Sequence, residues 1–101
     1  MKLGRVIGTA VSTVKASGLN SYKLLLVCDF RGEAQESPDD QNNFYVAIDT
    51  VGAGIGEVVL VAQGGASRMF SDVPLKAPVD AAIVAILDTV RIGDHAIFER
   101  K

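Results

Sequence analysis

Several residue types are scarce in this sequence, and each scarcity argues against a class of function. The chain has one cysteine, Cys28, so it forms no internal disulfide and suits a reducing compartment. Tryptophan is absent and aromatic residues make up 6% of the chain, which leaves little for base-stacking platforms. The ten Lys and Arg residues are scattered, and the formal net charge is −2. Because binding to phosphate backbones needs clustered positive charge, we expect no nucleic-acid partner.

Long apolar runs are also missing, although the total apolar content is high. No run approaches the roughly 20 residues that a membrane-spanning helix needs, and we therefore expect no membrane contact. Hydrophobic residues nevertheless make up 49% of the 101 residues. A domain of this size buries only roughly two-thirds of the surface of its unfolded chain. The composition therefore predicts that other copies of the chain cover the excess apolar surface.

The pattern of apolar and turn residues predicts a small all-β domain. Strands rich in Val, Ile and Leu are expected over Leu3–Thr13, Tyr22–Phe30, Phe44–Val51, Glu57–Gln63 and Ile83–Ile92. A turn is expected at Gly93-Asp94, followed by a short last strand over Ala96–Phe98. A short helical turn is expected over Gly64–Phe70, and a briefer one near Asp80. Five strands with glycine-marked bends favour a barrel, because closure removes exposed strand edges. Residues 1–101 are thus predicted to form a single domain, a five-stranded barrel with one short helix between strands four and five.

The segment Gly52-Ala53-Gly54-Ile55-Gly56-Glu57 is the part of the sequence most similar to a cofactor-binding motif. A dinucleotide fingerprint needs GxGxxG spacing, a strand before it and a helix after it. Here the spacing is GxGxG, and Val58–Val61 predicts a strand, so no helix N-terminus faces a pyrophosphate. We interpret the segment as a tight turn between strands whose glycines allow positive φ or close backbone contact. No cofactor is predicted.

Catalytic and metal-binding patterns are weak elsewhere. His95 is the only histidine, no serine is marked as a nucleophile, and a zinc site lacks ligands. Four carboxylates fall in the polar loop Arg31–Asn43, but their spacing fits no calcium loop. Cys28 follows an apolar run and is predicted to be a buried, unreactive thiol. Asp49, Asp80 and Asp88 are expected to accept hydrogen bonds from backbone or arginine. We predict that the protein is not an enzyme and holds no metal.

Four blocks of sequence resemble the EutN/CcmL family, the vertex (BMC-P) shell proteins of bacterial microcompartments. They are Leu3–Gly8 continuing through Ser12–Lys15, Lys23–Val27, Val46–Val61 and Pro78–Asp88. The blocks follow the family's order and cover nearly the whole chain, and the third is the most specific. One departure lies after the fourth strand, where the family usually reads Gly-Ser-Ser-Ala-Arg and this chain reads Gly64-Gly65-Ala66-Ser67-Arg68. The arginine is retained, and the serines are displaced.

The resemblance implies a barrel with oligonucleotide-binding (OB)-like topology that forms a cyclic pentamer at the vertices of a polyhedral shell. The implied partners are four sister subunits and hexameric shell proteins, and the implied location is the shell of a cytoplasmic microcompartment. We expect Gly52, Ala53, Gly54, Gly56 and Glu57 to lie at a subunit interface or the fivefold axis, because small residues let backbones approach closely. Contacts to a neighbouring shell protein are expected from Gly64, Gly65, Ala66, Ser67 and Arg68.

Two other classes of function stay open on the residues alone. An oligonucleotide-binding barrel shares the expected fold, although fold is a poor guide to function and the charge argues against it. A small cofactor-binding enzyme subunit is the third interpretation, and it predicts a ligand that copurifies with the protein. The mass of the native species separates the three, because a pentamer, a nucleic-acid complex and a loaded monomer differ in mass.

Overall fold

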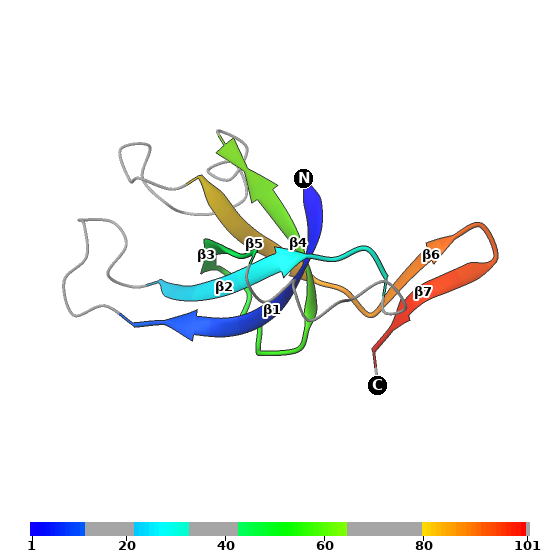
Figure 1. The fold of residues 1–101 in the computed structure, drawn as a ribbon, viewed down its shortest axis with the longest axis horizontal. Coiled ribbons are helices and arrows are strands. Elements are labelled where there is room, and N and C mark those ends of the chain that lie inside the picture. Colours follow the sequence, from blue (N-terminus) through cyan, green and yellow to red (C-terminus); the bar gives the residue numbers. More distant parts are fainter. Residues whose placement is uncertain (12–21, 33–42, 65–79, 101) are drawn as a thin grey trace.

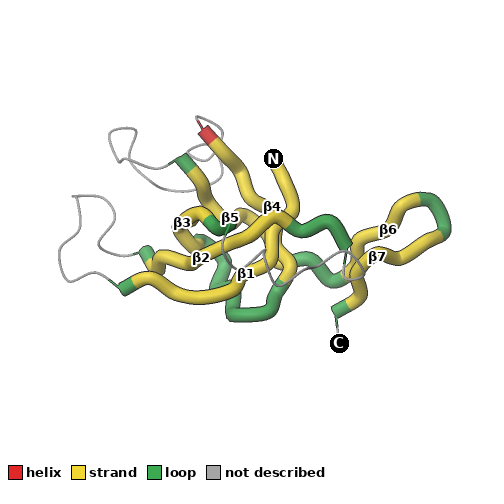
Figure 2. The backbone as a smooth tube through the Cα atoms, in the orientation of Figure 1, coloured by secondary structure: helices red, strands yellow, loops and turns green. Residues whose placement is uncertain are grey.

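The computed structural model describes residues 1–11, 22–32, 43–64 and 80–100, which together contain seven strands (Figures 1 and 2). The strands are β1 (Lys2–Ala10), β2 (Lys23–Asp29), β3 (Tyr45–Asp49), β4 (Val58–Gln63), β5 (Ala81–Ile86), β6 (Thr89–Ile92) and β7 (His95–Glu99). The first five close into a barrel in the order β1-β2-β3-β5-β4, while β6 and β7 form a separate two-stranded sheet. The expected all-β fold with a closed five-stranded barrel is confirmed.

Alternation along each strand fills the barrel with aliphatic side chains. Leu25 and Val27 of β2 point inward with Ala47 of β3, because successive residues of a strand face opposite sides of the sheet. The same interior cluster contains Val6, Ala53, Val59, Val61, Ala81 and Ile83, all of them buried. These side chains are mostly branched at Cβ or small, which suits the narrow lumen of a five-stranded barrel.

Strand β1 is bent so that it can pair with β2 on one side and β4 on the other. Its pairing with β2 slips between Val6 and Gly8, which marks a β-bulge at the bend. A side chain on Gly4 would collide with Val27 and come within 3.2 Å of the Cys28 carbonyl oxygen. Gly8 therefore lies at the bend, and Gly4 lies where the neighbouring strand is too close for a side chain. Cys28 is buried, as predicted.

The fifth strand differs from its prediction. A single strand over Ile83–Ile92 was expected, but β5 begins at Ala81 and ends at Ile86, and β6 belongs to the other sheet. The N–H of Leu87 donates to the Val58 carbonyl at 2.9 Å, after which the chain leaves the barrel. The apolar run ends at this exit, where the polar and exposed residues Asp88 and Thr89 follow Leu87. The sequence therefore does carry a sign of the break. Asp80, where a brief helical turn was expected, lies in a bend.

The β6–β7 hairpin projects from one end of the barrel (Figure 1). It turns at Gly93-Asp94, as predicted, and packs against the barrel through Phe98. The rings of Phe98 and Phe30 meet edge to face, with centroids 5.7 Å apart and planes at 81°. The guanidinium carbon of Arg5 lies 5.1 Å from the Phe30 ring centroid and 5.7 Å from that of Phe98. Aromatic and cation–π contacts thus seat the hairpin on the barrel.

The short helix expected between the fourth and fifth barrel strands falls on residues 65–79, outside the described residues. Gly64, the last described residue before them, follows the end of β4 and has a positive φ of 59°. In the described part of the chain, no helix has the length and apolarity that crossing a membrane requires.

Candidate functional site

The loop from Thr50 to Glu57, which joins β3 to β4, is shaped by one carboxylate. Asp49 ends β3, and its Oδ1 accepts hydrogen bonds from the backbone N–H groups of Val51, Gly52 and Ala53 at 3.1, 3.1 and 3.2 Å. Three convergent donors on one charged oxygen make a strong local cap. The expectation that Asp49 accepts backbone hydrogen bonds is confirmed, and the carboxylate fixes the first half of the loop.

The second half of the loop is tied to strand β1. The N–H of Gly56 donates to the Val6 carbonyl at 2.8 Å, and the N–H of Val6 donates to the Glu57 carbonyl at 3.0 Å. Arg5 Nη1 donates to the Gly56 carbonyl at 2.6 Å. Backbone groups that would otherwise need water are therefore satisfied within the subunit, and the loop is held in one shape before any partner arrives.

Two glycines of the loop adopt conformations that other residues rarely reach. Gly52 and Gly56 have φ values of 80° and 90°. The predicted positive-φ turn is confirmed at these two positions, whereas Gly54 is not among the positive-φ residues. A Cβ on Gly54 would have the Glu57 Oε1 as its nearest contact, at 3.4 Å. The subunit itself therefore has room for a Cβ at Gly54, whereas a Cβ at Gly52 or Gly56 would strain the backbone.

Glu57 connects the loop to the hairpin. Its Oε1 accepts a hydrogen bond from the Gly54 N–H at 2.8 Å. Its Oε2 lies 2.8 Å from Arg100 Nη2, an ion pair whose geometry is not that of an aligned hydrogen bond. Arg100 also donates to Asp88 Oδ1 at 3.4 Å, as expected for Asp88. One carboxylate thus holds both the glycine loop and the end of β7.

A cleft of about 490 Å³ lies between the loop and the hairpin, lined by Arg5, Ile55, Glu57, Leu87, Phe98 and Arg100 among others. Its charged groups are already engaged within the subunit: Arg5 with Gly56, and Glu57 with Arg100. No group of three or more metal-ligating side chains occurs among the described residues. The arrangement is that of a rigid, internally satisfied loop beside a shallow surface.

A family model described as ethanolamine utilisation protein EutN/carboxysome matches residues 1–88. The chain belongs to this EutN/CcmL family. It is 38% identical over 101 residues to the carboxysome shell vertex protein CcmL of Synechococcus elongatus, covering 100% of this chain and 97% of that protein. The resemblance stated from the sequence is confirmed.

Solved structures agree with the family assignment. The CcmL of Gloeobacter violaceus superposes with a TM-score of 0.84 at 36% identity, covering 99% of this chain and 98% of that one. GrpN of Rhodospirillum rubrum, a pentameric microcompartment shell protein, superposes with a TM-score of 0.74 at 40% identity, covering 91% and 99%. The described strands, hairpin included, therefore have the arrangement of EutN/CcmL proteins.

The predicted interface residues of this EutN/CcmL chain lie in different surroundings. Gly52 and Gly56 are exposed, and Gly54 and Glu57 are half-buried. The Ala53 side chain is buried in its own barrel core, so it can meet a partner through its backbone only. These five positions remain predictions as interface residues. Gly64 is exposed, and its N–H donates to the Asp80 carbonyl at 2.7 Å; Gly65, Ala66, Ser67 and Arg68 lie outside the described residues.

The sequence prediction left out one residue of this loop that now stands out. Ile55 is 68% exposed at the tip of the turn, next to the cleft. A large apolar side chain between two glycines of a turn was the available signal, because turns normally carry polar residues.

Proposed function

We propose that this protein is a structural subunit of a closed pentamer that occupies the vertices of a polyhedral microcompartment shell in the cytoplasm. The observation that carries the proposal is similarity along the whole chain to carboxysome and other microcompartment shell vertex proteins, at 38% and 41% identity for CcmL of Synechococcus elongatus and EutN of Salmonella typhimurium. Since the similarity covers the entire barrel and hairpin, it supports the same assembly for this chain.

Geometry explains why such a shell needs this subunit. Sixfold tiles form a flat sheet, and fivefold points give a closed polyhedron its curvature. A ring forms from a head-to-tail interface whose rotation closes after a fixed number of copies. The driving force is the burial of apolar surface that a lone barrel leaves exposed. Ile55 and Val51, beside the glycine loop, are two of the large apolar residues exposed in the single subunit.

The proposal includes the neighbours of the pentamer. Hexameric shell proteins surround it, and the segment Gly64–Arg68 contacts one of them, with Arg68 donating to carbonyl or carboxylate oxygens. The role is structural and involves no catalysis or nucleic acid. Oligonucleotide binding shares only the barrel topology with this proposal, and a gel shift at low salt tests it directly, because charge-driven binding is strongest there.

The decisive experiment has two parts. Native mass spectrometry of the purified chain is expected to give a mass of five subunits with no added ligand mass. Electron microscopy of shells coexpressed with this chain is expected to show closed polyhedra, and shells without it are expected to have open vertices. A monomer in the first measurement, or closed shells in both arms of the second, would refute the proposal.

Gly54→Val tests whether the glycine loop lies at a subunit interface or the fivefold axis. A Cβ at Gly54 makes only an ordinary contact, at 3.4 Å to Glu57 Oε1, so the monomer is expected to fold with an unchanged far-UV circular dichroism spectrum. The pentamer is expected to be lost, because a branched side chain keeps two backbones apart. The control is Thr89→Val, which replaces a hydroxyl with a methyl group at an exposed position of the hairpin. Intact pentamers of Gly54→Val in native mass spectrometry would remove the loop from the interface.

A further inference from the structure

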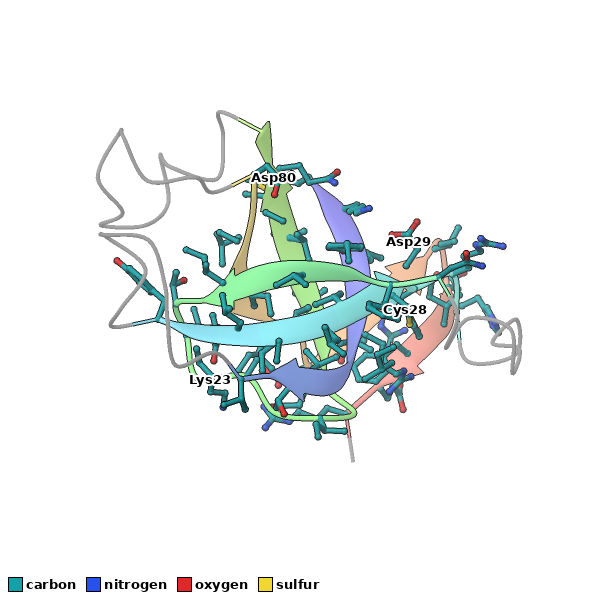
Figure 3. The ribbon with its side chains drawn as sticks, turned by 60° about the vertical axis from the view of Figure 1, so that its left-hand side comes forward. Lys23, Cys28, Asp29 and Asp80 are labelled. Atoms are coloured by element: carbon teal, nitrogen blue, oxygen red, sulfur yellow. The ribbon has the colours of Figure 1, made fainter. Side chains whose placement is uncertain are left out.

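The outer face of the barrel is apolar where β2 and β3 run side by side (Figure 3). Leu26 of β2 lies opposite Val46 of β3, and both alternate with residues of the interior cluster, so they face outward. Val46 is 44% exposed, and Phe44, two residues earlier, is 50% exposed. In a sheet that faces water, outward positions are usually polar. Here they are not.

The apolar face continues onto β1 at Gly8, and the charged residues of β2 lie outside its middle. Gly8 of β1 lies opposite Leu26, and a Cβ there would meet Leu26 Cδ1 at 3.4 Å, so Leu26 also covers part of β1. The charged residues of β2, Lys23 and Asp29, lie at the two ends of that strand (Figure 3). The middle of the face therefore has no charge on β2 or β3 that would oppose its burial in an interface.

Strand β3 has an open edge beside the same residues. In the described part of the chain, β5 pairs with β3 only at Ile48 and Asp49. The preceding half, Tyr45–Ala47, has β2 on one side and no described strand on the other. An unpaired strand edge exposes backbone donors and acceptors that can pair with another chain, and natural proteins normally protect such edges with charge or proline. This one has neither.

We infer that Leu26, Phe44, Val46 and the open Tyr45–Ala47 edge, together called the β3 surface, form one half of the head-to-tail contact and bind a second copy of this chain. The inference rests on the proposed pentamer, and it places the contact on the barrel wall in addition to the glycine loop. The β3 surface combines exposed apolar side chains with unpaired backbone groups. Another protein chain can cover the side chains and also form hydrogen bonds to the backbone, whereas a small ligand would do only one of these.

We assign the β3 surface to contact with a sister subunit, because in a closed ring every copy has a surface that its neighbour covers. A heterologous interface joins two different patches, one of which must be presented to each neighbour. Pentameric assembly of GrpN, which shares the fold and 40% of the sequence, supports a second copy over an unrelated partner. Apolar side chains centred on a strand edge are a common means of joining two chains through their sheets.

Val46→Glu tests the inference. The side chain is exposed, so the subunit is expected to fold with an unchanged circular dichroism spectrum, while five buried carboxylates abolish the pentamer in native mass spectrometry. Val46→Thr keeps the shape and the strand preference of valine and replaces one methyl with a hydroxyl. This variant is expected to fold. The protein concentration at which half of its pentamers have dissociated is expected to rise by at least about tenfold, which corresponds to roughly 1.4 kcal/mol of binding free energy.

Ile92→Glu is the matched control. Ile92 is 68% exposed, more than Val46, but lies on β6 of the hairpin sheet. It is expected to leave the pentamer intact. Two results would overturn the assignment of the β3 surface. One is that Val46→Glu pentamers dissociate at the same protein concentration as the wild type. The other is that Ile92→Glu loses the pentamer to the same extent as Val46→Glu. A monomeric wild-type protein would instead overturn the proposed function, so the two failures are distinguishable.

Discussion

At the scale of single residues, Asp49 shows how one side chain determines a surface. Its carboxylate accepts hydrogen bonds from three backbone N–H groups that follow β3. These bonds direct the loop across the end of the barrel. Thr50 Oγ1 donates to the Ile83 carbonyl at 2.7 Å, which fixes the loop to β5 as well. The exposed glycines and Ile55 are therefore presented in a fixed geometry. A ring interface benefits, because a preorganised loop loses little entropy on assembly.

Tyr45 is the residue with the most perturbed titration. Burial of the phenol raises its pKa well above the ordinary value, and the nearby charges of Asp29 and Cys28 add to the effect. Its hydroxyl has no hydrogen-bond partner among the described residues, and Lys2 Nζ lies 4.0 Å from the ring centroid. The neutral phenol is therefore favoured in the folded state.

Tyr45→Phe should change how stability depends on pH. Near pH 7 the variant is expected to be equal to the wild type or more stable by up to about 1 kcal/mol, since it removes an unpaired hydroxyl. Above about pH 10 the unfolded tyrosine ionises while the folded one does not, so the wild type loses stability as the pH rises. At pH 11 the wild type is expected to have lost about 0.5–1 kcal/mol more unfolding free energy than the variant. The full effect is ~1.4 kcal/mol per pH unit above the pKa of the unfolded tyrosine, and the partial exposure of the ring reduces it.

Urea unfolding at pH 7 and pH 11, at one protein concentration, measures the two differences. Every other ionisable group is present in both proteins, so the comparison isolates the effect of the Tyr45 hydroxyl, including its interactions with neighbouring groups. A difference between variant and wild type that stays constant over this pH range would show that Tyr45 ionises normally in the folded state.

At the scale of elements, the sequence predicts what local chemistry determines. Runs of Val, Ile and Leu bounded by glycine located all the strands of the barrel, and the Gly93-Asp94 turn located the hairpin. The exit from the barrel at Leu87 and Asp88 was missed, although Asp88 and Thr89 interrupt the apolar run there. Two polar residues also occur within single strands, and the change of sheet depends on which carbonyl pairs with Leu87. The burial of Ala53 in the core was missed for the same reason, since a small residue suits an interface and a barrel end equally well.

Arg100 links the β6–β7 hairpin to the glycine loop through its ion pair with Glu57. Arg100→Ala is expected to cost about 0.5–1 kcal/mol, because the ion pair with Glu57 is partly exposed. The local effect is larger: amide hydrogen exchange should speed up over 95–100 and over 54–57, while β1–β3 in the barrel stay protected. The N–H of Arg100, which donates to the Asp88 carbonyl at 2.7 Å, is kept in this variant.

Glu99→Ala is the control for this unit. Glu99 pairs with Arg91 at 3.8 Å, and both side chains are mostly exposed, so no change in exchange is expected outside the hairpin. Hydrogen exchange read by mass spectrometry compares the two variants peptide by peptide. Equal exchange over 54–57 in Arg100→Ala and the wild type would show that the hairpin and the loop are independent.

At the scale of the whole molecule, the apolar surface has two destinations. Buried side chains form separate clusters, in the barrel interior, under the hairpin, and around Ile48 and Ala82. Outward residues such as Phe44, Val46 and Ile55 remain exposed in the single subunit. The sequence predicted an excess of apolar surface but not its position, because strands that are apolar on both faces give no alternation from which to read the outer side.

Folding and assembly are therefore expected to be coupled, and the coupling can be measured without any mutation. When five subunits bind only in their folded form, a tenfold rise in protein concentration stabilises each one by roughly 1 kcal/mol, a few degrees in Tm for a chain of this size. Thermal unfolding followed by circular dichroism between about 1 and 100 μM tests this. A Tm that does not change over this range would mean that the barrel is stable alone and that its exposed apolar residues contribute nothing to assembly.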